Sequence, residues 1–244
     1  MIKKSEINQP TAAVIIIGDE ILSGRTCDSN SNYIAKKLSS IGIKLIEIRT
    51  ISDDKKVIIK NINKLRKRYN YIFTSGGIGP THDDITAESV AMALNIKLVI
   101  NEKAKKILED YYLSKDQTFN DARMKMARTP IGSKLIRNDV SSAPGFNIKN
   151  IFVLAGVPEI FQNMVNNLLQ DLKTGPITLS QTIVIDKPEG DIVKSLDEIV
   201  SKYKNISIGS YPFFKNNKIG TNIVVRHHDK FTLKKVCDEL EKLR

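Results

Sequence analysis

The stretch that decides the fold of this chain is Gly76-Gly77-Ile78-Gly79-Pro80-Thr81-His82-Asp83-Asp84. It directly follows residues 71–75, an apolar and β-branched run typical of a buried strand, and it precedes a helical pattern over 85–94. Three glycines in four positions let a backbone approach a ligand closely and point bare N–H groups at an anion. Two adjacent carboxylates make sense there if a divalent cation lies between them and a phosphate. The stretch therefore predicts a phosphate-binding loop at the end of a strand.

Strands and helices alternate around this loop over the first 175 residues. The patterns predict strands at 13–17, 43–51, 71–75 and 151–154, and helices at about 29–41, 54–69, 85–94, 102–113, 119–128 and 158–172. This order predicts an α/β fold in three layers, a mostly parallel sheet with helices on both faces. A boundary near Lys173–Pro176 would separate a domain of residues 1–175 from a small α+β domain of residues 176–244.

Three loops leave predicted strand ends and should face one crevice, because ligands of such sheets bind at the carboxyl ends of the strands. They are Gly18–Gly24, Gly76–Asp84 and Ala155–Glu159. The first loop holds Asp19 and Glu20 between glycines, which suits a ligand or metal contact but also an ordinary turn with solvated acids. The second has the spacing of neither the P-loop nor the dinucleotide fingerprint. One acid of Asp83 and Asp84 is expected to cap the following helix, which leaves the other for a cation.

Composition narrows the classes of function. The net charge of +11 invites a nucleic-acid interpretation, but the positive charge is spread along the chain and indicates mostly a solvated basic surface. Residues 176–244 lack the Gly-x-x-Gly loop of a KH module, so nucleic-acid binding is not expected. The two cysteines are far apart, no apolar run approaches the roughly 18 residues of a membrane span, and residues 1–6 lack an apolar signal region. We expect a reduced, cytoplasmic protein without membrane contact.

A family resemblance rests on several segments. The pattern Gly-Asp-Glu-Ile-Leu-Ser-Gly over 18–24, then Asn30, then residues 75–88, resembles the molybdopterin-binding (MoaB/Mog) family. The closest resemblance is to the N-terminal domains of the competence/damage-inducible protein CinA and of eukaryotic FAD synthases. It spans about residues 11–172 and includes Ala127, Pro130, Asn138, Ala143-Pro144-Gly145-Phe146 and Gly156-Val157-Pro158. Residues 208–212 are also similar to the small domain that follows in these proteins.

The resemblance implies a crevice for a nucleotide or pterin. CinA-like members imply a metal-dependent pyrophosphatase acting on ADP-ribose or a similar dinucleotide; Mog-like members imply adenylylation of molybdopterin. Catalytic acids map onto Asp53 and Asp84, and Asp19, Asp83 and Asp84 are the expected ligands of Mg²⁺, Mn²⁺ or Co²⁺. The expected nucleotide- or phosphate-binding residues are Gly18, Asn30, Ser75, Gly76, Gly77, Gly79, Thr81, Asn138, Gly145, Gly156, Pro158 and Glu159. A homo-oligomer is also expected.

Some residues depart from the family's pattern or have a simpler explanation. Ala155 stands where many relatives have proline, Met126 replaces a common glutamine, and Glu159 directly follows Pro158 as in the FAD-synthase branch. From the residues alone, Asp53 is expected to be the N-cap of the helix that begins at 54. Neither the amidohydrolase domain of full-length CinA nor the catalytic domain of FAD synthase follows, so neither nicotinamide mononucleotide deamidation nor FAD synthesis is expected.

Overall fold

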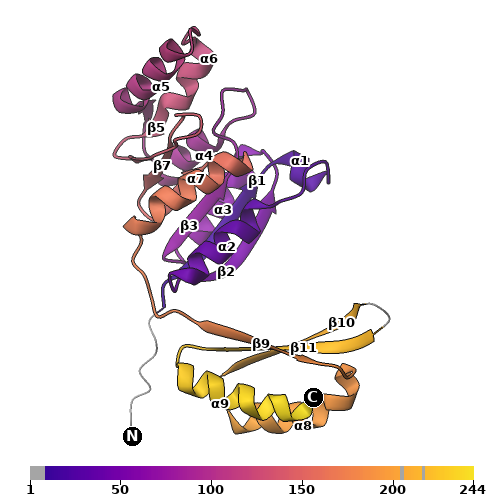
Figure 1. Cartoon of the computed structure of the whole chain (residues 1–244). Coiled ribbons are helices and arrows are strands. Elements are labelled where there is room, and N and C mark those ends of the chain that lie inside the picture. The colour runs from indigo at the N-terminus through magenta and orange to yellow at the C-terminus, as the bar shows by residue number, and fades with distance from the viewer. Residues whose placement is uncertain (1–8, 204–205, 216–217) are drawn as a thin grey trace, which may run out of the picture. The chain divides into compact units, whose positions relative to one another are not determined.

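The structure is a computed structural model that describes residues 9–203, 206–215 and 218–244. The chain divides into two compact units (Figure 1), the first ending at Gly175 and the second running from Pro176 to Arg244. Each unit has its own hydrophobic core and is described by itself.

The first unit is built on a six-stranded sheet in the order β2-β1-β3-β8-β7-β6. The four strands β2, β1, β3 and β8 are parallel, whereas β7 and β6 are antiparallel additions at one edge. Their bounds are β1 Thr11–Ile17, β2 Lys44–Ile51, β3 Tyr71–Ser75, β6 Lys134–Ile136, β7 Gly145–Ile148 and β8 Ile151–Leu154. The predicted mostly parallel sheet is confirmed.

Helices cover both faces of this sheet. Successive side chains of β1 point to opposite faces and are buried on both. Ala12, Val14 and Ile16 pack toward α2 (Asn30–Ser40) and α7 (Pro158–Leu168). The alternate residues of β1 pack toward α3 (Lys55–Leu65) and α4 (Thr86–Leu94). A strand buried on both faces needs an unbroken apolar run, which the sequence 12–17 supplies. The three-layer architecture predicted from the alternation of elements is therefore confirmed.

A small lobe interrupts this pattern after α4. It contains β4 (Leu98–Ile100), α5 (Glu102–Ser114), α6 (Asp121–Met124), the 3₁₀ turn η1 (Lys125–Ala127) and β5 (Arg128–Pro130). The helix predicted over 119–128 is wrong in its second half, because β5 pairs with β4 in antiparallel register, with Arg128 opposite Ile100. This pairing brings η1 and β5 next to the functional site described below.

The second unit is a three-stranded antiparallel sheet in the order β10-β11-β9 with two helices packed on one face. The elements are β9 Leu179–Ile185, α8 Glu189–Lys202, β10 Ser207–Lys215, β11 Lys218–His227 and α9 Lys230–Leu240. Short pieces complete the chain: α1 Asp19–Leu22, η2 Leu169–Asp171 and η3 Glu241–Leu243. In the part of the chain that the structure describes, no helix has the length and apolar character needed to cross a membrane.

Candidate active site

The three loops expected to share a crevice do share one. A cavity of about 390 Å³, here named the acidic cavity, lies at the carboxyl ends of β1, β3 and β8. Its lining comprises Ile17 and Glu20 from the first loop, Gly76–Pro80 with Asp83 and Asp84 from the second, and Ala155, Gly156 and Val157 from the third. Asp53, Met126, Ser141, Ala143 and Ile160 complete the lining. The position is the one at which open parallel sheets bind ligands.

The first two glycines of the central loop are required by the packing of the chain itself. Gly76 has φ +107° and Gly77 has φ +70°, backbone conformations that residues with a side chain rarely adopt. A Cβ on Gly76 would lie 2.2 Å from the carbonyl oxygen of Ile17, and one on Gly77 would lie 2.2 Å from Oγ1 of Thr86. Close approach to a ligand, the reason given for these glycines from sequence, is therefore not needed to explain them.

The amides after Gly76 are nevertheless free to bind an anion. The N–H of Gly76 donates to the carbonyl oxygen of Leu154 at 3.1 Å. The N–H groups of Gly77, Ile78 and Gly79 donate to no other residue that the structure describes. All three residues line the acidic cavity. Successive unpaired amides at a turn attract phosphate oxygens, so the geometry suits a phosphate here.

Hydrogen bonds to Asp84 hold residues 81–84 of the loop in a turn. Its Oδ2 accepts hydrogen bonds from the backbone N–H of Thr81 at 2.8 Å and from Oγ1 of Thr81 at 2.5 Å. The expectation that Asp83 or Asp84 caps α4 is wrong, because the N-cap is Ile85 and no side chain caps this helix end. A side-chain hydrogen bond from Thr81 also lowers the pKa of Asp83, and Thr81 is not among the residues that line the acidic cavity.

Asp53 is not a helix cap. The N-cap of α3 is Asp54, whose Oδ1 accepts the N–H of Val57 at 2.9 Å, so the prediction from sequence was wrong by one residue. Asp53 instead lines the acidic cavity and accepts the N–H of Asp19 on its Oδ2 at 2.9 Å. The structural explanation that competed with a functional role for Asp53 is thereby removed.

Four carboxylates line the acidic cavity, from Glu20, Asp53, Asp83 and Asp84. Burial is the largest cause that raises the pKa of Asp53 above its usual value, and the neighbouring carboxylates of Asp19, Glu20 and Asp83 raise it further. A carboxylate surrounded by others is stabilised when a cation binds among them. The electrostatics therefore favour a cation in the cavity.

The expected metal ligands do not form a site made of protein groups alone. Within residues 9–203, 206–215 and 218–244, no three His, Cys, Asp or Glu side chains lie close enough together to hold a metal ion. Glu20, rather than Asp19, lines the cavity beside Asp53, Asp83 and Asp84. Mg²⁺ commonly uses only one or two carboxylates and takes its other ligands from water and substrate phosphates. The oxygen donors present fit an ion that binds together with a phosphate.

Asn30 and Ser75 meet in a smaller cavity of about 50 Å³, which shares Ile17, Glu20 and Gly156 with the acidic cavity. Nδ2 of Asn30 donates to Oγ of Ser75 at 2.9 Å and to the carbonyl oxygen of Gly156 at 2.7 Å. Pro158 also lines this cavity. Four of the expected binding residues are therefore together, and the amide of Asn30 joins the starts of α2 and α7 to the end of β3.

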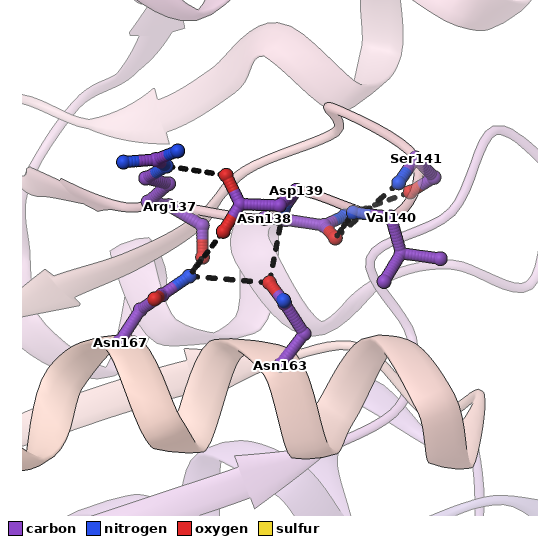
Figure 2. Close-up of polar contacts among 7 residues, drawn as sticks. All are labelled: Arg137, Asn138, Asp139, Val140, Ser141, Asn163 and Asn167. Atoms are coloured by element: carbon purple, nitrogen blue, oxygen red, sulfur yellow. Dashed lines mark hydrogen bonds and ion pairs between the residues drawn. The ribbon is translucent and has the colours of Figure 1, made fainter.

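Asn138 holds the loop that follows β6 in place through hydrogen bonds to Val140 and Ser141 (Figure 2). Its Nδ2 donates to Oγ of Ser141 at 2.7 Å and to the carbonyl oxygen of Ala143 at 2.8 Å, and its Oδ1 accepts the N–H groups of Val140 and Ser141. Ser141 and Ala143 in turn line the acidic cavity. Asn163 of α7 accepts the N–H of Asp139 at 2.9 Å, so the loop is fixed to that helix.

The remaining expected residues lie outside the lining of the acidic cavity. Gly18 follows β1 and donates its N–H to the carbonyl oxygen of Ile51 at 3.2 Å. Gly145 lies in β7, where a Cβ would be 2.5 Å from the carbonyl oxygen of Val153. Glu159 is exposed in the first turn of α7. Ser141, which lines the acidic cavity, was not predicted from the sequence, where its only signal is its position between Asn138 and Ala143.

Comparison with known proteins identifies the family. Residues 13–174 match a family described as a probable molybdopterin binding domain. The chain belongs to this family. Residues 178–243 of this molybdopterin-binding-family protein match the middle domain of FAD synthase. The resemblance inferred from the glycine loop and its neighbouring segments is confirmed.

Two relatives align with nearly the whole chain, and one solved structure aligns with part of it. A protein of Archaeoglobus fulgidus is 36% identical over 231 residues, which are 94% of this chain and 96% of that protein. A probable FAD synthase of Caenorhabditis elegans is 30% identical over an alignment of 259 positions, which covers 96% of this chain but only 50% of that enzyme. The structure of CinA from Thermoplasma acidophilum, a protein described as of unknown function, matches with a TM-score of 0.61 and 30% identity, over 66% of this chain and 98% of that one.

Proposed function

We propose that this CinA-like protein is a metal-dependent pyrophosphatase that hydrolyses ADP-ribose or a similar dinucleotide. The observation that carries the proposal is the acidic cavity itself. One wall presents the unpaired amides of Gly77–Gly79, and other parts of the lining present four carboxylates. Amides suit the oxygens of a phosphate, whereas carboxylates suit the cation that accompanies a pyrophosphate.

Asp53 is the residue best suited to accept a proton. Its Oδ2 is occupied by the N–H of Asp19, which leaves Oδ1 for a water molecule. A raised pKa makes a carboxylate a better base near neutral pH. Water would form a new O–P bond while the bridging P–O bond breaks, the water proton would pass to Asp53, and the bridging oxygen would leave on the second phosphate. Two phosphomonoesters result, one of them AMP when the substrate is ADP-ribose.

The residues that would hold a divalent cation are Asp83 and Asp84, with water and the phosphates of the substrate supplying its other ligands. When bound, Mg²⁺, Mn²⁺ or Co²⁺ would neutralise charge on the phosphoryl group and lower the pKa of a water ligand. Asp84 also keeps the loop closed through Thr81. An asparagine at 84 keeps an oxygen that can accept from Thr81 but lacks the charge.

The experiment is a screen of purified protein against ADP-ribose, NADH and FAD with Mg²⁺, Mn²⁺ or Co²⁺, with the products identified by mass spectrometry. We expect AMP from at least one pair of substrate and metal. Asp84→Asn should abolish this activity while the circular dichroism spectrum is unchanged. Failure of every pair to release AMP would overturn the proposal.

A second candidate function is molybdopterin binding, or adenylyl transfer to molybdopterin, in molybdenum cofactor biosynthesis. The description of the matched family supports it, because that family is named for molybdopterin binding. The same cavity would serve, with the amides of Gly77–Gly79 on the phosphate of the pterin. Tight binding of molybdopterin together with an absence of dinucleotide turnover would favour this candidate.

A further inference from the structure

The glycine loop separates two cavities. A second cavity of about 90 Å³, here named the basic cavity, shares Gly77, Ile78, Gly79, Asp84 and Met126 with the acidic cavity. The remainder of its lining comes from α4, β4, β7, the segment before β7 and the lobe. It is composed of His82, Ile85, Ala87, Glu88, Leu98, Lys125, Arg128, Pro144 and Phe146. The three residues with unpaired amides, Gly77–Gly79, therefore line both cavities.

The charge balance of the basic cavity differs from that of the acidic cavity. Glu88 pairs with Nζ of Lys55 at 2.9 Å, whereas Asp84 accepts from the neutral Thr81 and keeps its charge. Arg128 is exposed, and its guanidinium forms no hydrogen bond or ion pair with any residue in the described ranges. Lys125 donates through Nζ to the carbonyl oxygen of Thr81, which does not neutralise its charge. The basic cavity thus holds two cations against the one carboxylate, Asp84, that no cation pairs with, and Arg128 has no partner among the described residues.

The size of the basic cavity limits what it can hold. A cavity of about 90 Å³ has room for several water molecules, and therefore for a phosphate group. Arginine and lysine are the side chains that proteins use most for phosphate oxygens, arginine because its planar fork can donate two parallel hydrogen bonds.

We infer that the basic cavity binds a phosphomonoester, with Arg128 and Lys125 as its cationic ligands. The inference deepens the proposed function and rests on it. Hydrolysis of a pyrophosphate produces two phosphomonoesters. The phosphate group of each product carries more negative charge than the same phosphate group did in the substrate. The four carboxylates of the acidic cavity repel this added charge once no cation screens it. The basic cavity, on the other side of the same loop, receives the phosphate end of one product.

The test uses ribose 5-phosphate as the probe, with full-length protein in low salt and without divalent cations. Amide chemical shifts report where the probe binds. We expect the shifts of Gly77–Gly79 and Arg128 to move together, with a single dissociation constant. Arg128→Gln should weaken binding about 10-fold, the expected effect of losing one charge-assisted hydrogen bond. Lys125→Gln should weaken it as well.

Arg66→Gln is the matched control, because it removes the same charge from the end of α3, where Arg66 contacts Asn63 rather than a cavity. We expect its dissociation constant to stay within about twofold of the wild type. Equal weakening by Arg128→Gln and Arg66→Gln would overturn the inference, since only the overall charge would then matter. Absence of shifts at Arg128 would overturn it too.

The proposed function and this inference can fail separately. Binding of ribose 5-phosphate requires no turnover, so a protein that binds it at Arg128 but hydrolyses no dinucleotide would refute only the pyrophosphatase. A protein that releases AMP but shows the same product inhibition by ribose 5-phosphate in wild type and Arg128→Gln would refute only the basic cavity.

Discussion

Gly76→Ala tests whether the glycine loop is held against the end of β1 as the structure shows. The substitution adds one methyl group at a backbone with φ +107°. The new Cβ would lie 2.2 Å from the carbonyl oxygen of Ile17, a backbone atom of a fully paired central strand. Unlike a flexible side chain, that oxygen cannot rotate away, so β1 or the loop must shift.

Two costs add together. A positive φ at a residue with a side chain costs about 1–2 kcal/mol, and forcing an extra methyl group into a packed site costs about 1–3 kcal/mol. Gly76→Ala should therefore lower the free energy of unfolding by roughly 2–5 kcal/mol. Gly24→Ala is the control, because Gly24 has φ +75° but a Cβ there would have no atom within 4 Å. Gly24→Ala should therefore show only the cost of a positive φ, about 1–2 kcal/mol.

Urea denaturation followed by circular dichroism measures both variants against the wild type. The expected result is a midpoint for Gly76→Ala clearly below that of Gly24→Ala, with similar slopes. Equal losses in the two variants would refute the close contact between Gly76 and Ile17. They would also remove the packing explanation for the first glycine of the loop.

Two further changes test the surroundings of the loop. Because the pKa of Asp53 is raised above 3.8 in the folded protein, its contribution to stability is greatest below pH 3.8 and falls as pH rises through the folded pKa. As pH rises through the folded pKa of Asp53, Asp53→Asn should therefore become more stable relative to the wild type. If the difference between the urea midpoints of the two proteins did not change with pH, this would contradict the burial of Asp53 among carboxylates. Asn138→Ala should cost about 2–3 kcal/mol, because it removes the hydrogen bonds of a buried side-chain amide and leaves partly buried N–H and carbonyl groups unpaired. If the free energy of unfolding fell by less than about 0.5 kcal/mol in the same urea assay, this would contradict a stabilising role for the hydrogen bonds of Asn138.

Much of the architecture was predictable from the sequence, because the elements of the central sheet have simple signals. The apolar run 12–17 indicates a strand buried on both faces, and alternation of strands with helices indicates a parallel sheet. The meeting of three loops at one cavity followed from the rule for carboxyl ends of strands. The lobe was less predictable, since the pairing of Arg128 with Ile100 joins residues 28 positions apart, which local periodicity does not reveal.

The sequence was enough to predict which loops line the site, but not which contacts the individual side chains make. Asp53 and Asp54 are chemically identical neighbours, and only the fold shows that Asp54 caps α3 while Asp53 lines the cavity. Likewise, Asp84 was expected to face a cation or cap α4, whereas its Oδ2 binds Thr81. Such choices depend on backbone direction within one turn, which sequence patterns do not specify.

That same pair of aspartates gives the most direct test of the central claim, that the acidic cavity hydrolyses a nucleoside pyrophosphate. Asp53→Asn and Asp54→Asn remove equal charge at adjacent positions, and asparagine can still cap α3. The measurement is the rate of AMP release from ADP-ribose at saturating metal. We expect the rate to fall at least about 100-fold in Asp53→Asn, which is within the usual contribution of general base catalysis, and to stay close to wild type in Asp54→Asn. Equal rates in the two variants, or no AMP from the wild type, would contradict the central claim.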